Sequence, residues 1–308
     1  MKNIILKEHV RTRVDARIER ILRELGNPPP PVNLADVREL LKLSLSYFSG
    51  EDDDLWQRTF HRLRIARKQI LERPMLLFDA IKQFRLRAIY LPDRRRVLLD
   101  DNVPLPKHRW LEAHEFSHDI LPWHRALLFG DDEVTVTPAC HVRIEAEANF
   151  AAGQLLFLRD RFVEEVRSSP ITFAAVKTIS GIYKNTLTTT LWRVIERATG
   201  EVPFFGVVSG HPHTSRRPTD FDPTRPCKHF VQSPSFAERF SCVGETDVFY
   251  GIARHCGMQR GGPLGAGELL LADDNGDEHV FTFETFYNGH EALTLGRHAR
   301  KVAVAVSV

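Results

Sequence analysis

The chain has 308 residues, 42 Lys and Arg against 40 Asp and Glu, and 43% hydrophobic residues. This composition excludes a collagen-like, largely disordered or disulfide-stapled chain, and the balanced charge excludes a strongly basic nucleic-acid binder. No apolar run reaches the roughly 18–20 residues of a membrane span, and the first nine residues carry charges that break any signal-peptide core. We therefore expect a cytoplasmic protein of about two domains with no membrane association.

The first hundred residues predict helices and one hairpin. Apolar positions at helical spacing predict a helix over residues 4–25 that ends at Gly26, and Asn33 is expected to cap a second helix from Leu34. Further helical patterns cover residues 55–71 and 74–84. A predicted hairpin pairs residues 86–91 with residues 96–99.

Residues 105–200 are almost wholly helical in pattern, and their last part, 160–199, resembles a helix-turn-helix with its turn at Ser180-Gly181. After residue 200 the pattern changes to short apolar runs punctuated by Gly and Pro, which predict strands at 202–209, 269–271, 280–285, 292–295 and 302–308. We expect an α+β protein with a mainly helical domain over 1–200, which includes a small sheet, and a β-rich domain over 201–308.

The strongest chemical motif is His114-Glu115-Phe116-Ser117-His118. Two His residues four positions apart project from one face of a helix, so both imidazoles can bind the same Zn²⁺. Glu115 lies beside them, where its carboxylate can take a proton from water activated by the metal.

A catalytic zinc needs a third protein ligand, and two residues compete for that role. His124 follows His114 by ten residues, but Leu121 stands where this arrangement favours a Gly for a sharp turn. Glu145 lies on a later predicted helix and shares a face with Asn149, so the carboxylate can ligate the metal while the amide orients a ligating His. The residues favour Glu145, and they favour a solvated position for Glu147.

The run Leu111–His118, followed by Glu145-x-x-x-Asn149 and Leu155-Leu156, resembles the ImmA/IrrE family of zinc metallopeptidases over about residues 30–200. The resemblance implies a zincin-like domain in which His114, His118 and Glu145 hold Zn²⁺, Glu115 is the catalytic base and Asn149 supports the site. Ser117, Ala151 and Phe157-Leu158 depart from the family's usual residues at positions that concern packing rather than ligation.

Two residues just before Glu145 are further candidates. A Cys140 thiolate near the zinc can fill the open coordination position and silence the enzyme. His141 lies one helical turn before Glu145 and is a candidate to stabilise the oxyanion or to exchange a proton.

Enzymes of this family characteristically cleave a helix-turn-helix transcriptional repressor, which relieves repression after stress, DNA damage or phage challenge. The layout also resembles the peptidase of repressor–peptidase pairs that control anti-phage operons such as CBASS. The domain over 201–308 is then expected to be a sensor, GAF-like or PAS-like, that responds to single-stranded DNA or another activating ligand. The alternatives are a DNA-binding or signal-binding module with a structural metal site, and a general secreted peptidase.

Overall fold

A computed structural model describes residues 2–48, 88–91, 95–124, 138–168, 170–197 and 202–302. The side chains of Phe48, Ile89, Leu91 and 138–141 are outside this description. The helices predicted at 55–71 and 74–84, and the strand predicted at 302–308 beyond Val302, also fall outside it. The chain forms two compact units, one of Leu6–Arg159 and one that joins Met1–Ile5 to Asp160–Val308.

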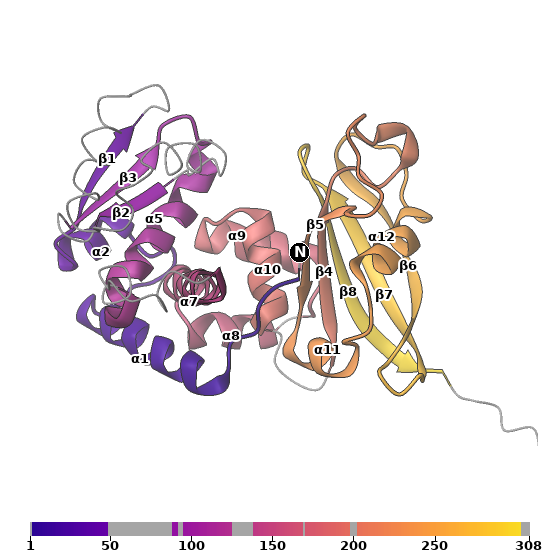
Figure 1. Cartoon of the computed structure of the whole chain (residues 1–308), viewed down its shortest axis with the longest axis horizontal. Coiled ribbons are helices and arrows are strands. Elements are labelled where there is room, and N and C mark those ends of the chain that lie inside the picture. The colour runs from indigo at the N-terminus through magenta and orange to yellow at the C-terminus, as the bar shows by residue number, and fades with distance from the viewer. Residues whose placement is uncertain are drawn as a thin grey trace, which may run out of the picture. The chain divides into compact units, whose positions relative to one another are not determined.

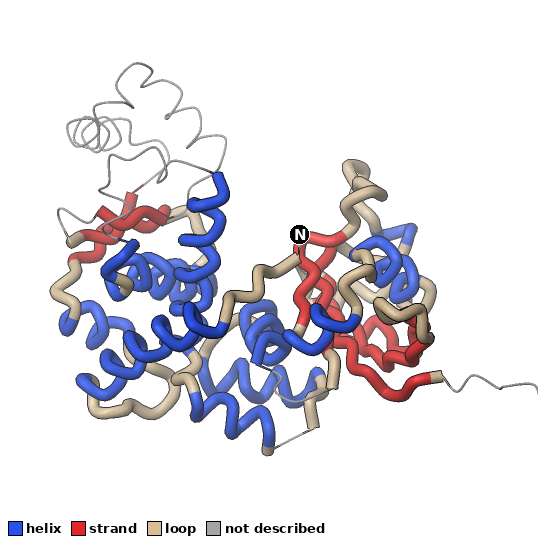
Figure 2. Tube along the Cα trace, turned by 60° about the horizontal axis from the view of Figure 1, so that its bottom comes forward, coloured by secondary structure: helices blue, strands red, loops and turns tan. Residues whose placement is uncertain are grey.

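The N-terminal unit combines helices with a short sheet (Figures 1 and 2). Its elements are α1 (Glu8–Glu24), α2 (Leu34–Leu40), β1 (Ser44–Phe48), β2 (Ala88–Leu91), β3 (Arg96–Asp100), α5 (Leu105–Ile120) and α7 (Pro138–Leu156). The sheet has the order β1-β3-β2, with β2 antiparallel and β1 parallel to β3. The predicted hairpin is therefore confirmed, whereas β1 was not predicted.

Local sequence explains where the first two helices begin and end. The apolar stripe of α1 is buried, and Gly26 follows the helix with a φ of 75°, a conformation that glycine adopts without strain. The Asn33 side chain accepts a hydrogen bond from the Ala35 N–H at 3.0 Å, so the predicted cap of α2 is confirmed.

The predicted first helix starts later than expected, at Glu8, because residues 2–3 pair with a strand instead. Lys2 forms a bridge with Phe230, and the Asn3 side chain accepts a hydrogen bond from the Gln232 N–H at 2.8 Å. This pairing places the first residues of the chain in the C-terminal unit.

Helix α7 lies between α1 and α5 and contacts both (Figure 1). Ala148, Ala151 and Ala152 are fully buried on α7, and their small side chains let neighbouring helices approach closely. Helix α5 ends at Ile120. The next residue, Leu121, has an extended backbone with a φ of −94°, and a further helical stretch begins at Pro122. The chain therefore changes direction at Leu121, three residues after His118.

The C-terminal unit is built on five antiparallel strands in the order β5-β4-β8-β7-β6. Its helices are α8 (Asp160–Arg167), α9 (Phe173–Tyr183), α10 (Leu187–Arg197), α11 (Pro234–Arg239) and α12 (Glu245–Ala253). Its strands are β4 (Phe204–Ser209), β5 (Cys227–Gln232), β6 (Gly262–Ala272), β7 (Glu278–Tyr287) and β8 (Ala292–Lys301). The expected α+β class is confirmed, and β5 is a strand that was not predicted.

Both faces of β4 are buried, which explains its continuous apolar sequence. On one face α10 packs so closely that a Cβ at Gly206 would lie 2.3 Å from the Ile195 side chain. On the other face Phe205 joins a core cluster with residues of α11 and α12, including Phe236 and Phe249. Helix α10 is thus a packing element of this sheet.

The helix-turn-helix interpretation of residues 160–199 had its turn in the wrong place. Ser180 and Gly181 lie inside α9, and the chain turns at Lys184, which adopts a left-handed conformation with a φ of 50°. The buried residues Ile179 and Tyr183 hold the last turn of α9 in place, and a single Gly weakens a helix by only about 1 kcal/mol. The contacts also group α8–α10 with the later sheet, so the compact units divide at 159/160 and not at the expected 200/201.

Within the part of the chain that the structure describes, every helix is too short or too polar to cross a lipid bilayer.

Candidate metal centre

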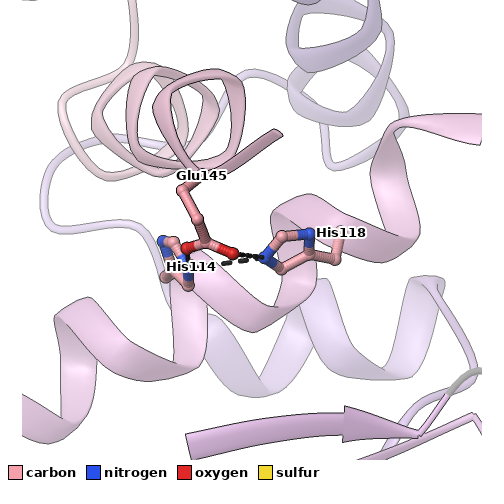
Figure 3. Close-up of side chains that lie close together, drawn as sticks. All are labelled: His114, His118 and Glu145. Atoms are coloured by element: carbon pink, nitrogen blue, oxygen red, sulfur yellow. Dashed lines mark hydrogen bonds and ion pairs between the residues drawn. The ribbon is translucent and has the colours of Figure 1, made fainter. Parts of the chain in front are cut away.

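Three potential metal ligands from two helices meet in the N-terminal unit (Figure 3). His114 and His118 project from the same face of α5, and Glu145 points toward them from α7. The Nε2 atoms of the two His residues are 3.4 Å apart. The Glu145 carboxylate oxygens lie 3.1 Å from Nε2 of His114 and 3.8 Å from Nε2 of His118.

These distances lie within a few tenths of an ångström of what a single tetrahedral ion requires. Zinc bonds of 2.0–2.2 Å to nitrogen and oxygen place neighbouring ligand atoms about 3.3–3.6 Å apart. Among the described residues, His114, His118 and Glu145 form the one group of three or more His, Cys, Asp or Glu that can hold a metal ion. The Glu145 side chain is 38% exposed, so the group is open to solvent on one side, as a fourth coordination position requires.

Each imidazole is supported on the nitrogen that faces away from the other ligands. Nδ1 of His114 lies 3.1 Å from the Asn149 side-chain oxygen, which can only accept a hydrogen bond. Nδ1 of His114 therefore carries a proton, and Nε2, which faces Glu145 and His118, is the nitrogen that can bind a metal ion once it is deprotonated. Asn149 thus lies where the sequence analysis expected a supporting residue.

His124 lies behind His118 and not among the ligand atoms. Its Nδ1 is 3.1 Å from Nδ1 of His118, and its side chain is fully buried. Leu121, with its negative φ, directs the chain to this position without the glycine turn that a third His ligand needs. Of the two residues that competed for the third position, the structure therefore brings only Glu145 to the ligand group.

Glu147 is buried, contrary to the solvated position expected for it. Its Oε2 accepts hydrogen bonds from Nε1 of Trp123 at 2.6 Å and from Nε2 of His124 at 3.2 Å, and Oε1 accepts one from Nε of Arg143 at 3.0 Å. Burial raises the pKa of this carboxyl, but the three donors outweigh it and hold the pKa at about 2. Of these three partners, only Arg143 can be expected from the sequence, because it lies four residues before Glu147 on the same helix. Trp123 and His124 come from another part of the chain.

Glu115 is buried beside His114, and burial is the main cause that raises its pKa from 4.5 to about 7. The charge of Glu145 raises the pKa further, whereas His114 and a hydrogen bond with the Tyr90 backbone lower it. A carboxyl group with a pKa near neutrality can both accept and return a proton. Burial and the neighbouring carboxylate thus give Glu115 a pKa at which it can exchange a proton near neutral pH.

The hairpin holds α5 through Asp119, a residue that the sequence analysis did not single out. The Tyr90 hydroxyl donates to Oδ1 of Asp119, and Nη2 of Arg95 donates to Oδ2 at 3.2 Å. Asp119 is adjacent to His118, so these bonds fix the end of the helix that carries the ligands. The side chains of Cys140 and His141, the other two candidates, lie outside the described residues.

The raised pKa of Glu115 predicts how the stability of the metal-free protein depends on pH. Between pH 4.5 and about 7 the folded state keeps a proton that the unfolded state releases, so stability falls as pH rises. The slope is at most about 1.4 kcal/mol per pH unit, and the effect vanishes below pH 4.5 because both states are then protonated. Denaturant titrations in EDTA measure the free energy of unfolding. From pH 5 to 7.5 this free energy should fall for wild type relative to Glu115→Gln, and an equal pH dependence in both proteins would contradict the prediction.

The chain matches no protein-family model and no curated protein. Among solved structures, it is similar to a Mycobacterium tuberculosis transcriptional regulator, with 10% sequence identity and a TM-score of 0.49. The similarity covers 96% of this chain and 92% of the other.

Proposed function

We propose that this protein is a zinc-dependent regulatory endopeptidase that cleaves a helix-turn-helix transcriptional repressor. One observation carries the proposal: potential ligand atoms of His114, His118 and Glu145 lie within 4.8 Å of one another. Two imidazoles, one carboxylate and an open side form the ligand set of catalytic zinc sites in peptidases. A structural zinc is instead enclosed by four protein ligands.

The residues around this group suit hydrolysis of a peptide bond. Zn²⁺ held by the three ligands would polarise the scissile carbonyl and acidify the attacking water. The Glu115 carboxylate would accept a proton from the attacking water and return it to the leaving amine nitrogen. Asn149 keeps His114 in the tautomer that can bind the metal through Nε2.

The resemblance to the ImmA/IrrE family supports the choice of substrate. A repressor as the substrate makes proteolysis a switch, because its cleavage derepresses a stress, DNA-damage or anti-phage defence operon. The C-terminal unit is a separate compact body with its own sheet and core, which suits a sensor for single-stranded DNA or another activating ligand. A sensor of this kind would confine cleavage to the signalled state.

The test is cleavage of a helix-turn-helix repressor, beginning with any such protein that is encoded next to this chain's gene. Zinc-loaded and EDTA-treated protein are each incubated with the purified repressor, with and without single-stranded DNA, and the products are identified by mass spectrometry. We expect discrete fragments only with zinc, and more of them when the DNA is present. A repressor that stays intact under every condition, with a metal whose removal unfolds the protein, would favour a structural metal site instead.

A further inference from the structure

Two buried polar side chains, His124 and Glu147, follow His118 in a line of contacts that begins at the nitrogen opposite its metal-facing Nε2. Nδ1 of His118 contacts Nδ1 of His124 at 3.1 Å, and Nε2 of His124 contacts Oε2 of Glu147 at 3.2 Å. The side chains of His118, His124 and Glu147 are 8%, 0% and 4% exposed. Water therefore has little access to these contacts, and the side chains satisfy one another.

The residues that surround Glu147 determine the direction of these hydrogen bonds. Trp123 and Arg143 can only donate, so Glu147 is an acceptor on both of its oxygens. Nε2 of His124 faces the same carboxylate, so it must carry a hydrogen and donate a hydrogen bond to Glu147. In a neutral His124 this leaves Nδ1 as an acceptor, and the contact between the two Nδ1 atoms requires the proton to be on His118.

We propose that His124, backed by Glu147, is a positioning residue for the metal: it holds His118 in the tautomer and orientation in which Nε2 binds the ion. The inference rests on the zinc site of the proposed function and adds a role for two residues outside the ligand set. A metal-binding His commonly donates its second N–H to a carboxylate or carbonyl, which increases its donor strength. Here a second His stands between the ligand and the carboxylate.

The two ligand imidazoles are thereby supported differently. His114 donates to the neutral Asn149 amide, whereas His118 donates to an imidazole that is itself bonded to a buried carboxylate. Loss of such outer partners typically weakens metal binding by about 10–100-fold. We expect the effect of His124 to fall in this range.

The C-terminal unit offers a matched control. His279 is buried, contacts Asp273 at 3.2 Å through Nε2, and contacts Nε2 of His298 at 2.9 Å through Nδ1. The carboxylate–His–His arrangement is thus repeated, but its last His is not a member of any metal-holding group among the described residues. A variant at His279 perturbs a comparable buried network without touching the metal centre.

The experiment measures zinc affinity by competition with a chromophoric chelator, together with the visible absorption spectrum of the Co²⁺-loaded protein. In His124→Leu we expect zinc to bind about 10–100-fold more weakly and the Co²⁺ spectrum to shift. His124→Gln should recover most of the affinity, because its amide can accept from His118 and donate to Glu147. His279→Leu should bind zinc as wild type does, and circular dichroism establishes that each metal-free variant is folded.

A folded His124→Leu variant with wild-type affinity and an unchanged Co²⁺ spectrum overturns the inference while leaving the proposed function intact. If His124→Leu does not fold, Glu147→Gln replaces it. Weaker zinc binding by this variant supports the inference, and wild-type affinity with an unchanged Co²⁺ spectrum overturns it. Failure of wild type to bind zinc is a different outcome, which overturns the proposed function and this inference together.

Discussion

Replacing Glu115 with Gln is expected to lower kcat for repressor cleavage by about 10²–10⁴-fold while zinc affinity changes little. The amide fills nearly the same volume as the carboxyl but cannot take a proton from water. Glu115 is not among the three ligand residues, so its replacement leaves the donor atoms of the ion in place. Single-turnover cleavage assays and a chelator competition on the same preparations separate the two effects.

Glu112→Gln is the matched control for this variant. Glu112 lies on the same helix, one turn earlier, and pairs with Arg38 at 3.3 Å and not with the ligand residues. We expect Glu112→Gln to cleave the repressor at close to the wild-type rate. Equal rates for wild type and Glu115→Gln would show that Glu115 is not the catalytic base and would favour the structural-site alternative.

Replacing Glu145 with Ala is expected to weaken zinc binding by at least about 100-fold, since loss of an outer partner already weakens it by about 10–100-fold. Among the described residues, the Glu145 carboxylate is the only ligand that α7 contributes, and without it two imidazoles of the group remain. Cleavage should fall with the occupancy of the site, and excess zinc should restore the part of the loss that is due to occupancy. Metal analysis after dialysis, combined with the cleavage assay, measures both.

Val142→Ala on the same helix controls for indirect effects on α7. The Val142 side chain is 52% exposed, and an Ala at this position preserves the helix. This variant should keep stoichiometric zinc. A Glu145→Ala protein that also retains tightly bound zinc would contradict the ligand assignment and would return the third position to His124 or to another residue.

The pairing of His114 with His118 could be predicted from the sequence because it depends only on local geometry. Residues four apart on an α-helix share a face whatever the helix packs against. The same reason applies to the Asn33 cap, to the stripe of α1 and to Gly26 at its end, which all concern neighbouring residues. The hairpin of β2 and β3 is also a local pairing across a short connection.

Features that depend on distant segments were missed or placed differently. Strand β1 pairs with β3 across about fifty residues of chain, and its five residues carry little pattern of their own. Helices α8–α10 have the amphipathic pattern of many bundles. Contacts with distant strands, such as the fit of α10 over Gly206 and the stacking of Phe173 on Phe286, assign them to the C-terminal unit. The pattern indicates that a helix has a buried face, but it does not indicate what covers that face.

In the candidate site, too, some features could be predicted from local sequence and others depend on tertiary packing. Residue type and spacing along α5 were sufficient to identify a candidate metal-binding motif and the carboxylate beside it. The meeting of Glu145 with the His pair, the position of His124 behind His118 and the burial of Glu147 follow from how α7 and the segment after Leu121 pack against α5. Contacts between segments depend on packing that minimises voids and satisfies buried polar groups, and this balance is set by the whole unit and not by any one stretch of it.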